Sequence, residues 1–398
     1  MSEVTAQPPL LGLRVLDLAS YFAGPGAAMF LADYGADVVK IELPAGDPGR
    51  SAPPRVQGTD ISKAFLVSNR GKRSAVINWR LPAGQQVMDR LLQQADAVIL
   101  DRPLGAAASG WPFHYRRLHA LNPRLVHASS TPFDRNGRYA EFPAYEPLVQ
   151  AASGVMGASR TREGRPVHAG FRLGESATAM LLAYGVMMAL LTRMRSGQGL
   201  RVETSMLQAA IAMQSVQLVW ADDDPTPPSD PAQATVASYQ CADRRYINII
   251  TIQERQWQAM CRVLELDHLI GDPSYSSGTA RTQRRAELFP LLEGIFGTRP
   301  SEEWLRLLQE ADVPCGPTLS RLELFDDPQI VENGVSAAIT HPTLGLVQML
   351  GSPISFSETP VQVGRSVPEL GEHTRQVLTE AGFPTAEIDA LVADRVIR

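Results

Sequence analysis

The stretch Leu13–Pro44, LRVLDLASYFAGPGAAMFLADYGADVVKIELP, decides the expected fold. It opens with a short apolar run, LRVLDLAS, that is rich in β-forming residues. A Gly-Pro-Gly turn at residues 24–26 follows, then a helical segment and a second apolar run, DVVKIELP. A strand, a turn, a helix and a second strand make a βαβ unit, which predicts a parallel sheet.

The alternation of helix and strand continues beyond this unit. SAVINW at 74–79 is a third strand candidate, and the segments 84–103 and 118–130 each resemble a helix followed by a strand. We therefore predict an α/β fold with a Rossmann-like large domain over residues 1–220. Gly24 and Gly26 do not form a GxGxxG fingerprint, so we expect no nicotinamide or flavin cofactor.

The rest of the chain predicts a second, smaller domain. An Asp- and Pro-rich linker spans residues 221–235. An α+β domain is expected over 236–325, with a hairpin around Ala242–Arg245 and helices over 254–266, 281–296 and 301–311. The segment 326–398 carries mixed strand and turn signals and a final helix within 369–383.

Composition excludes several classes of protein. The 398 residues carry a net charge of −5, without the basic bias of a nucleic-acid binder. The most apolar stretch, Ala177–Leu191, is shorter than the roughly 20 residues of a membrane span, and predicts a buried core helix. No signal peptide is evident, and the three cysteines show no metal-ligand spacing. We expect a cytoplasmic protein with no resident metal and no nucleic-acid or membrane partner.

Glu175 is the first candidate for chemistry, because it stands at the start of a long apolar helix predicted over Glu175–Arg195. An acid in the first turn of a helix is favoured by the macrodipole by roughly 0.3–1 kcal/mol. The same position also presents a carboxylate rigidly, as a nucleophile toward an activated acyl group requires. The residues alone leave both interpretations open.

Two further stretches carry candidate groups. Tyr145 and Glu146 precede a small-residue helix, and indicate either a core tyrosine with a helix-start acid or a hydroxyl and a carboxylate in a cleft. Arg70, Lys72 and Arg73 cluster around a glycine. This cluster is typical of a solvated turn, and it also suits the phosphates of a nucleotide-like ligand.

These stretches together resemble the class III CoA-transferases, the CaiB/BaiF group that includes formyl-CoA transferase, carnitine-CoA transferase and α-methylacyl-CoA racemase. The resemblance runs through nearly the whole chain. Its opening block is Leu11–Arg50, and further blocks are NRGKRSAVINW, LNPRLVHAS, PAYEPLVQAASGVMG, AYGVMMALLTRMRSGQGLRVETSM, DVPCGPTLSRLELFDDPQIVENG and VPELGEHTRQVLTEAGF. It implies a large domain with a smaller inserted domain, a C-terminal segment that returns to the large domain, and an interlocked homodimer.

The resemblance also implies the chemistry. An aspartate of the family attacks an acyl-CoA thioester, forms a mixed anhydride and then an enzyme–CoA thioester, and passes CoA to a small carboxylic acid. Gly185 follows Glu175 by ten residues, as a glycine follows that aspartate, so Glu175 occupies its position. We expect catalytic roles for Glu175, Tyr145 and Glu146. The expected CoA-binding residues are Ser20, Tyr21, Ala23, Lys40, Arg70, Lys72, Arg73, Asp101 and Arg102.

The chain departs from the family pattern at two of these positions. Glu175 adds a methylene to the usual aspartate, and Asp101 stands where the family often has an asparagine. The racemases have a histidine at the position of Tyr145, which argues against racemase activity here. A CoA-transferase is our first hypothesis. The alternatives are an acyl-CoA isomerase or lyase on the same fold, and a catalytically weakened CoA-binding subunit of a hetero-oligomer.

Overall fold

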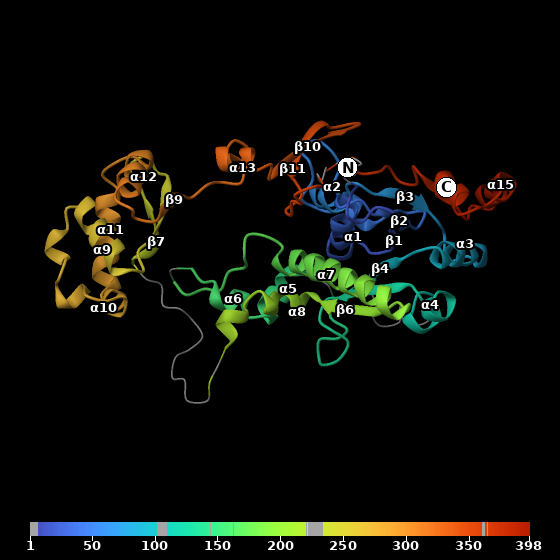
Figure 1. Ribbon diagram of the computed structural model, residues 1–398, viewed down its shortest axis with the longest axis horizontal. Coiled ribbons are helices and arrows are strands. Elements are labelled where there is room, and N and C mark those ends of the chain that lie inside the picture. The colour runs from blue at the N-terminus through green and yellow to red at the C-terminus, as the bar shows by residue number, and fades with distance from the viewer. Residues whose placement is uncertain are drawn as a thin grey trace, which may run out of the picture. The chain divides into compact units, whose positions relative to one another are not determined.

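The chain divides into two compact units. The computed structural model describes residues 7–101, 110–143, 145–161, 163–219, 221, 234–359, 363 and 365–398. Unit 1 contains Met1–Val219 and Val331–Arg398, and unit 2 contains Trp220–Ile330. Each unit has its own hydrophobic core, and Figure 1 traces both along the chain.

A six-stranded parallel sheet forms the centre of unit 1, in the order β3-β2-β1-β4-β5-β6. The strands are β1 (Arg14–Asp17), β2 (Asp37–Glu42), β3 (Arg73–Val76), β4 (Ala97–Asp101), β5 (Val126–Thr131) and β6 (Arg201–Ser205). The predicted α/β fold with a parallel sheet is confirmed. The order reverses between β1 and β4, and ligands of such sheets bind at the carboxyl ends of the strands beside that point.

Helices cover both faces of this sheet. Successive residues of a strand point to opposite faces, so Val15 of β1 belongs to one core cluster and Leu16 to the other. The Val15 face is covered by α1 (Ala23–Asp33) and α7 (Leu173–Ser196). The Leu16 face is covered by α3 (Pro82–Gln93), α4 (Tyr115–Leu121), α14 (Thr374–Glu380) and α15 (Thr385–Ala393). The double cover explains why the central strands are apolar on both sides.

Helix α7 is longer than the sequence predicts. It runs for 24 residues to Ser196, and the next residue, Gly197, ends the helix with a left-handed φ of 72°. By length and composition alone it could cross a membrane, and it is the one helix of the described residues with that property. However, 56% of its most apolar window lies inside the protein, as in a core helix. Its buried side packs against α1 and the sheet.

The segment after unit 2 completes the sheet edge of unit 1. The backbone N–H of Val76 donates to Thr374 Oγ1 at 3.0 Å, and Ile77 forms an antiparallel bridge with Ile397. Ser74 Oγ accepts the backbone N–H of Gly371 at 2.9 Å. Figure 1 shows the red C-terminal segment, with α15, in the region of β3 and α3. The edge of β3 is thereby covered rather than left open.

Unit 2 is a small α+β unit. Its antiparallel sheet contains β7 (Val236–Gln240), β8 (Tyr246–Ile250) and β9 (Cys315–Pro317). The helices are α9 (Glu254–Val263), α10 (Gly278–Gln283), α11 (Arg285–Phe296) and α12 (Ser301–Glu310). The predicted hairpin turn at Ala242–Arg245 is present between β7 and β8. The single helix predicted over 281–296 is instead two helices, α10 and α11, separated at Arg284.

The remaining elements are short. The helices are α2 (Lys63–Ser68), α5 (Glu146–Ala152), α6 (Val155–Ala158), α8 (Met206–Ala212) and α13 (Pro328–Glu332), and the strands are β10 (Ser336–His341) and β11 (Gly345–Leu350). Short 3-10 helices are η1 (Pro48–Ser51), η3 (Ser215–Leu218), η4 (Asp267–Leu269), η5 (Pro273–Tyr275) and η6 (Glu323–Phe325).

Candidate active site

A cavity of about 940 Å³ opens in unit 1 at the carboxyl ends of the strands. Its lining comes from the β1–α1 turn, residues 52–53, the ends of β4 and β5, the start of α5, the segment that leads into α7, and the first residue of α8. Of the predicted site residues, the cavity is lined by Glu175, Tyr145, Glu146, Ser20, Tyr21, Ala23 and Asp101. The cavity therefore lies beside the switch point of the sheet, where sheets of this strand order commonly bind ligands.

Glu175 lies in the first turn of α7 with only 12% of its side chain exposed. Arg172, three residues earlier, donates from Nη1 to Glu175 Oε2 at 2.6 Å. Burial raises the pKa of Glu175, and the Arg172 guanidinium opposes that rise. The result is a largely enclosed carboxylate that has a cation beside it and faces the cavity.

Glu146 holds the start of α7 in place. Its Oε1 accepts the backbone N–H of Gly174 at 2.8 Å, and its Oε2 accepts that of Glu175 at 2.9 Å. These are two of the N–H groups that a helix start leaves without partners. A Cβ on Gly174 would lie 3.2 Å from Glu146 Oε2 and 3.1 Å from Val149, so the small residue permits this close approach. The contacts of Glu146 are those of a positioning residue.

Gln150 extends the same support one turn along α5. Its Nε2 donates to Glu146 Oε1 at 2.7 Å and to the carbonyl of Phe171 at 3.1 Å, and its Oε1 accepts the N–H of Ala169 at 2.8 Å. Gln150 is 1% exposed. It therefore fixes the segment that carries Arg172 and Glu175. Tyr145, just before α5, is exposed and lies on the cavity wall.

Asp101 ends β4 on another wall of the cavity. Its Oδ2 accepts the backbone N–H of Ser20 at 2.7 Å, and its Oδ1 accepts the Ser130 hydroxyl at 3.4 Å. Burial raises the pKa of Asp101 to about 7, and the nearby carboxylates Asp47 and Asp17 add to the rise. Asp101 is thus a carboxyl group that changes charge near neutral pH in the same cavity as Glu175.

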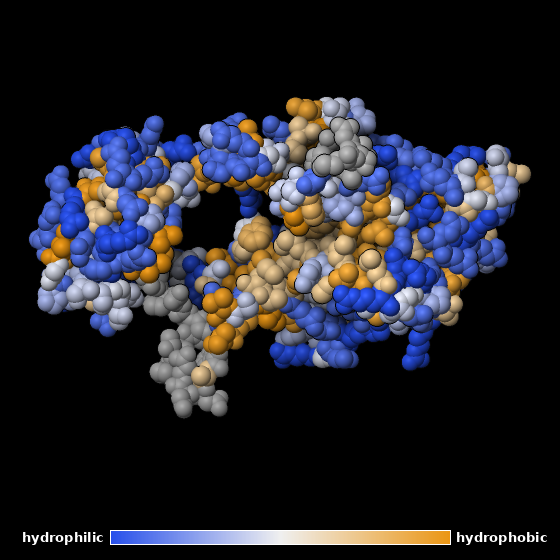
Figure 2. All heavy atoms as spheres, in the orientation of Figure 1, coloured by the Kyte–Doolittle hydropathy of each residue, from blue (hydrophilic) through white to orange (hydrophobic). Residues whose placement is uncertain are grey.

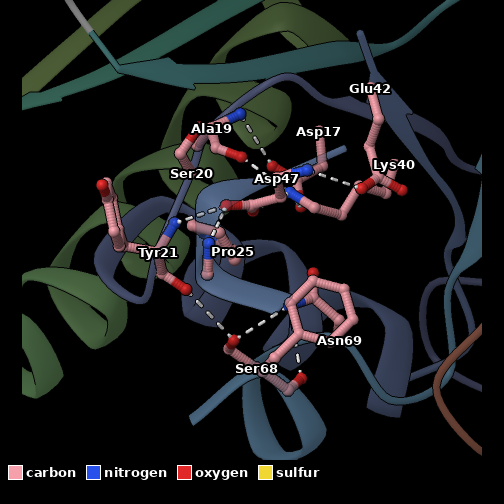
Figure 3. A network of polar contacts seen from close by, with 12 residues as sticks. Asp17, Ala19, Ser20, Tyr21, Pro25, Lys40, Glu42, Asp47, Ser68 and Asn69 are labelled. Carbon is pink, nitrogen blue, oxygen red and sulfur yellow. Dashed lines mark hydrogen bonds and ion pairs between the residues drawn. The ribbon is translucent and has the colours of Figure 1, made fainter. Parts of the chain in front are cut away.

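Tyr21 and Ala23 shape the turn between β1 and α1. Tyr21 has a φ of 64°, and its backbone N–H donates to Asp47 Oδ1 at 3.2 Å. A side chain in this left-handed region is unusual and is held by the surrounding contacts. Ala23 is the first residue of α1, so the helix N-terminus borders the cavity. Figure 3 shows Tyr21, Ser20 and Asp47 gathered at this turn.

Lys40 and Lys72 do not reach the cavity. Lys40 Nζ lies 2.9 Å from Asp47 Oδ2 and donates to the carbonyl of Ala19 at 2.7 Å (Figure 3). Lys72 Nζ donates to Asp17 Oδ2 at 2.7 Å, and also to Asn69 and Pro25. Burial lowers the pKa of Lys72 to about 8 despite Asp17, whereas Asp17 and Asp47 outweigh burial and raise the pKa of Lys40.

Arg70 and Arg73 are likewise committed to ion pairs. Arg70 donates to both oxygens of Asp33, at 3.0 and 2.7 Å, and to the carbonyl of Leu350. Arg73 donates to both oxygens of Asp37, and to Glu380 in α14. The Arg70–Asp33 pair is buried on both sides, so displacing Arg70 would leave a buried carboxylate uncompensated, whereas the Arg73 partners Asp37 and Glu380 are partly exposed. Neither arginine lines the cavity. Arg102 lies outside the described residues.

Sequence reasoning missed three groups on the cavity or next to it: Arg172, His168 and Gln150. Arg172 had a usable signal, because a cation three residues before Glu175 on a helix start shares its face. His168 is exposed and its Nδ1 lies 2.9 Å from the Ala169 carbonyl. Gln150 lies in the block PAYEPLVQAASGVMG, four residues after Glu146, whereas His168 belongs to none of the quoted blocks. In the described ranges, no three His, Cys, Asp or Glu residues are grouped to hold a metal ion.

Comparison with known proteins matches residues 10–374 to CoA-transferase family III. The chain is 30% identical to succinyl-CoA:glutarate CoA-transferase of Mus musculus, over 100% of this chain and 92% of the mouse protein. It is 32% identical to formyl-CoA:oxalate CoA-transferase of Streptomyces avermitilis, over 98% of this chain and 99% of that protein. A crystal structure of a CaiB/BaiF family protein from Brucella suis superposes with a TM-score of 0.82 at 28% identity, covering 94% of this chain and 100% of that one.

Proposed function

The chain belongs to CoA-transferase family III, and we propose that it moves CoA from an acyl-CoA donor to a small carboxylic acid with Glu175 as the nucleophile. CoA thioesters are the substrates that the family implies. The observation that carries the proposal is the placement of Glu175 on the cavity wall at the sheet's switch point, with its helix start fixed by Glu146.

The proposed reaction needs no oxidant, metal or net proton transfer. A Glu175 oxygen attacks the thioester carbonyl carbon, the C–S bond breaks, and CoA leaves as a thiolate while a mixed anhydride forms. The thiolate then attacks the Glu175 carbonyl carbon and releases the donor acid as a carboxylate. An acceptor carboxylate repeats both steps in reverse and leaves as its CoA thioester. In the first half-reaction the negative charge of Glu175 is lost as the donor acid leaves as a carboxylate, and in the second the acceptor carboxylate brings one negative charge that Glu175 regains.

The local structure supports this chemistry in two ways. The N-terminus of α1 borders the cavity, and its backbone N–H groups and dipole favour the negative charge of a tetrahedral oxyanion. The ion pair with Arg172 gives the longer Glu175 side chain a fixed orientation at the end of its extra methylene. A displacement of the carboxylate by about 1 Å would otherwise lower the reaction rate, and this orientation keeps the Glu175 carboxylate in a reactive position.

The relatives' names indicate the kind of acid. They specify succinyl-CoA with glutarate, and formyl-CoA with oxalate, in those proteins. We propose that this chain also uses small carboxylic acids. Identities near 30% do not carry the choice among them, because acceptor specificity depends on a few side chains of the cavity.

A second candidate function is acyl-CoA isomerisation. Asp101 supports it, because a carboxyl group with a pKa of about 7 in the same cavity as Glu175 makes an acid/base pair for proton transfer at carbon. An isomerase needs no acceptor acid. Turnover of an acyl-CoA in the absence of any carboxylate would therefore favour this candidate over transfer.

We also propose that the protein works as a homodimer. One side of α7 exposes a row of large apolar side chains at helical spacing: Met180, Tyr184, Met187, Met188, Leu191 and Met194. Met194 is 82% exposed. Figure 2 shows hydrophobic residues gathered over the region of α7. A second copy of this chain is the partner that would remove this row from water.

Trapping experiments test the proposed nucleophile. Incubation with an acyl-CoA and hydroxylamine, followed by peptide mass spectrometry, should show a hydroxamate on Glu175. Glu175→Gln should abolish it, and Glu141→Gln serves as the matched control. Turnover with an acceptor acid while Glu175 stays unmodified would overturn the assignment. Glu175→Asp should lower kcat by about 10- to 100-fold, since the carboxylate moves by about one bond length from its Arg172 partner.

A further inference from the structure

The cavity carries an uneven set of charges. Among the described residues that line it, Arg172 is the one arginine or lysine, whereas three residues are carboxylic acids: Asp101, Glu146 and Glu175. Glu146 is occupied by the backbone N–H groups of α7, and Asp101 by Ser20. The carboxylate that neutralises Arg172 is therefore Glu175, at 2.6 Å.

Arg172 is held on its other side as well. Its Nη2 donates to the carbonyl of Pro53 at 3.2 Å, and 37% of its side chain is exposed. The guanidinium is thus fixed between a neutral carbonyl and Glu175, with an open side toward solvent. A planar guanidinium in such a position can take a carboxylate through two parallel hydrogen bonds.

Acylation of Glu175 changes the charge at this point. The anhydride and the CoA thioester of Glu175 are both neutral, whereas Arg172 cannot lose its proton in a protein. Each time Glu175 is acylated, a partly enclosed cation loses its counter-ion. Water reaches the exposed 37% of the Arg172 side chain and screens part of its charge, and the enclosed remainder favours an external anion in the acylated enzyme.

We infer that Arg172 is the carboxylate-binding residue for the free acids of the reaction, and that it becomes available only when Glu175 is acylated. This inference rests on the proposed function. The acceptor oxygen must come within about 3–3.5 Å of the Glu175 carbonyl carbon to attack it. Arg172 lies within hydrogen-bond distance of that carboxyl group, so an acid bound to its guanidinium stands beside the reacting carbon.

This arrangement orders the reaction. In the free enzyme, Glu175 occupies Arg172 and repels other carboxylates, so free acids bind weakly and acyl-CoA reacts first. In the thioester form, the leaving donor acid and the entering acceptor compete for the same guanidinium. The thioester form of the enzyme should therefore accept an ionised carboxylic acid in preference to a neutral alcohol or amine of similar size.

Direct binding tests the inference without turnover. Glu175→Gln keeps the side-chain shape and removes its charge, as acylation does. Isothermal titration with acetate, succinate and glutarate as separate probes should show at least tenfold tighter binding of one or more acids to Glu175→Gln than to the wild type. The gain should disappear in the double variant Glu175→Gln with Arg172→Gln. Equal binding of all three acids to wild type and Glu175→Gln would overturn the inference.

Half-reaction kinetics separate this inference from the proposed function. The enzyme thioester, formed with succinyl-CoA or formyl-CoA, is exposed to succinate or to hydroxylamine, which is uncharged at neutral pH. Arg172→Gln should raise the half-saturating succinate concentration about 10- to 100-fold, Arg172→Lys should raise it less, and the hydroxylamine rate should change little. An unchanged succinate dependence overturns the role of Arg172, whereas a Glu175 that never acquires CoA overturns the proposed function while the titration still tests Arg172.

Discussion

The backbone N–H of Ser20 donates to the carboxylate of Asp101 across 2.7 Å, and so joins the ends of the two central strands where the strand order reverses. Helix N-termini at such switch points offer backbone N–H groups to an anionic ligand. Here the group that links the ends of β1 and β4 is the carboxyl group of Asp101. Its charge changes near neutral pH, which gives the cavity a pH dependence.

CoA affinity should fall as the pH rises through about 7. Below that pH Asp101 is protonated and neutral, and above it a negative charge faces a cavity that receives an anionic ligand. We expect the Kd of CoA to rise about two- to tenfold between pH 6 and pH 8, measured by isothermal titration. Asp101→Asn should flatten this trend. Asp60→Asn, whose side chain is 91% exposed, should keep the wild-type trend, and an equal trend in both variants would contradict the assignment.

The same group should lower the stability of the fold at alkaline pH. The folded-state pKa of about 7 exceeds the ordinary value of 3.8, so the folded protein binds more protons between these values and loses stability as the pH rises through this window. Asp101→Asn should therefore be more stable than the wild type at pH 8, by about 1–2 kcal/mol after solvent screening is allowed for. Thermal unfolding at pH 5 and pH 8 checks this, because the difference should shrink at pH 5.

Glu146→Gln should reduce kcat more than it changes the KM for acyl-CoA. A glutamine can accept one of the two N–H groups of Gly174 and Glu175, but its amide N–H₂ then faces the other, so the start of α7 shifts. We expect a loss of about 10- to 100-fold in kcat and about 1–2 kcal/mol in unfolding free energy. Steady-state kinetics and urea unfolding measure both.

The matched control for Glu146 is Glu310→Gln, which removes an exposed ion pair with Arg306 on α12. It should change unfolding free energy by no more than about 0.5 kcal/mol and leave kcat unaltered. A Glu146→Gln variant with normal kcat would show that the helix start does not depend on this carboxylate.

Lys72→Met should destabilise unit 1 strongly. Lys72 is 1% exposed and holds Asp17, whose other cation, Lys40, lies at 3.7 Å. Removing one partner of a buried pair costs about 3–5 kcal/mol, because it leaves a charge in the interior without full compensation. Urea unfolding checks this against Arg306→Met, where loss of a surface pair should cost about 0.5 kcal/mol or less. Equal costs would place Lys72 outside the stabilising network.

An aspartate in the exposed row of α7 should weaken the proposed dimer. Tyr184 and Leu191 are 63% and 53% exposed in the single chain, so Leu191→Asp is compatible with the folded unit but not with an apolar interface. Sedimentation velocity should show a dimer for the wild type and a shift toward monomer for Leu191→Asp. Leu322→Asp, at an 80% exposed site elsewhere, should leave the sedimentation unchanged. A monomeric wild type would contradict the proposal.

The sequence predicts the parallel sheet well, because its strands are short apolar runs separated by strong turn signals. The clustering of Glu175, Tyr145 and Asp101 around one cavity also follows from their places at strand and helix ends. The fate of the basic residues could not be predicted. Lys72 directly precedes β3, and its ammonium group pairs with Asp17 at the end of β1. Which side chains of β1 lie beside Lys72 depends on three-dimensional packing and not on the local sequence pattern.

The same limit explains Glu146 and α10. In the sequence Glu146 is an acid at the start of α5. In the structure it accepts backbone N–H groups at the start of α7, 28 residues further on. The separation of α10 from α11 falls at Arg284, and an arginine does not mark a helix end in the sequence as a Gly or Pro would. Contacts between segments far apart in sequence decide the role of Glu146.

The cover of β3 by residues 371–397 has a consequence for the synthesis of the protein. When the ribosome has made all six strands of the sheet, the chain that closes the β3 edge has not yet been translated, and the whole of unit 2 must come first. Unit 2 is one continuous stretch, and its contacts are complete as soon as it emerges. In the nascent unit 1, by contrast, the β3 edge stays open while more than a hundred further residues are translated. An open strand edge can pair with other chains, so during this interval it depends on chaperones that bind nascent chains.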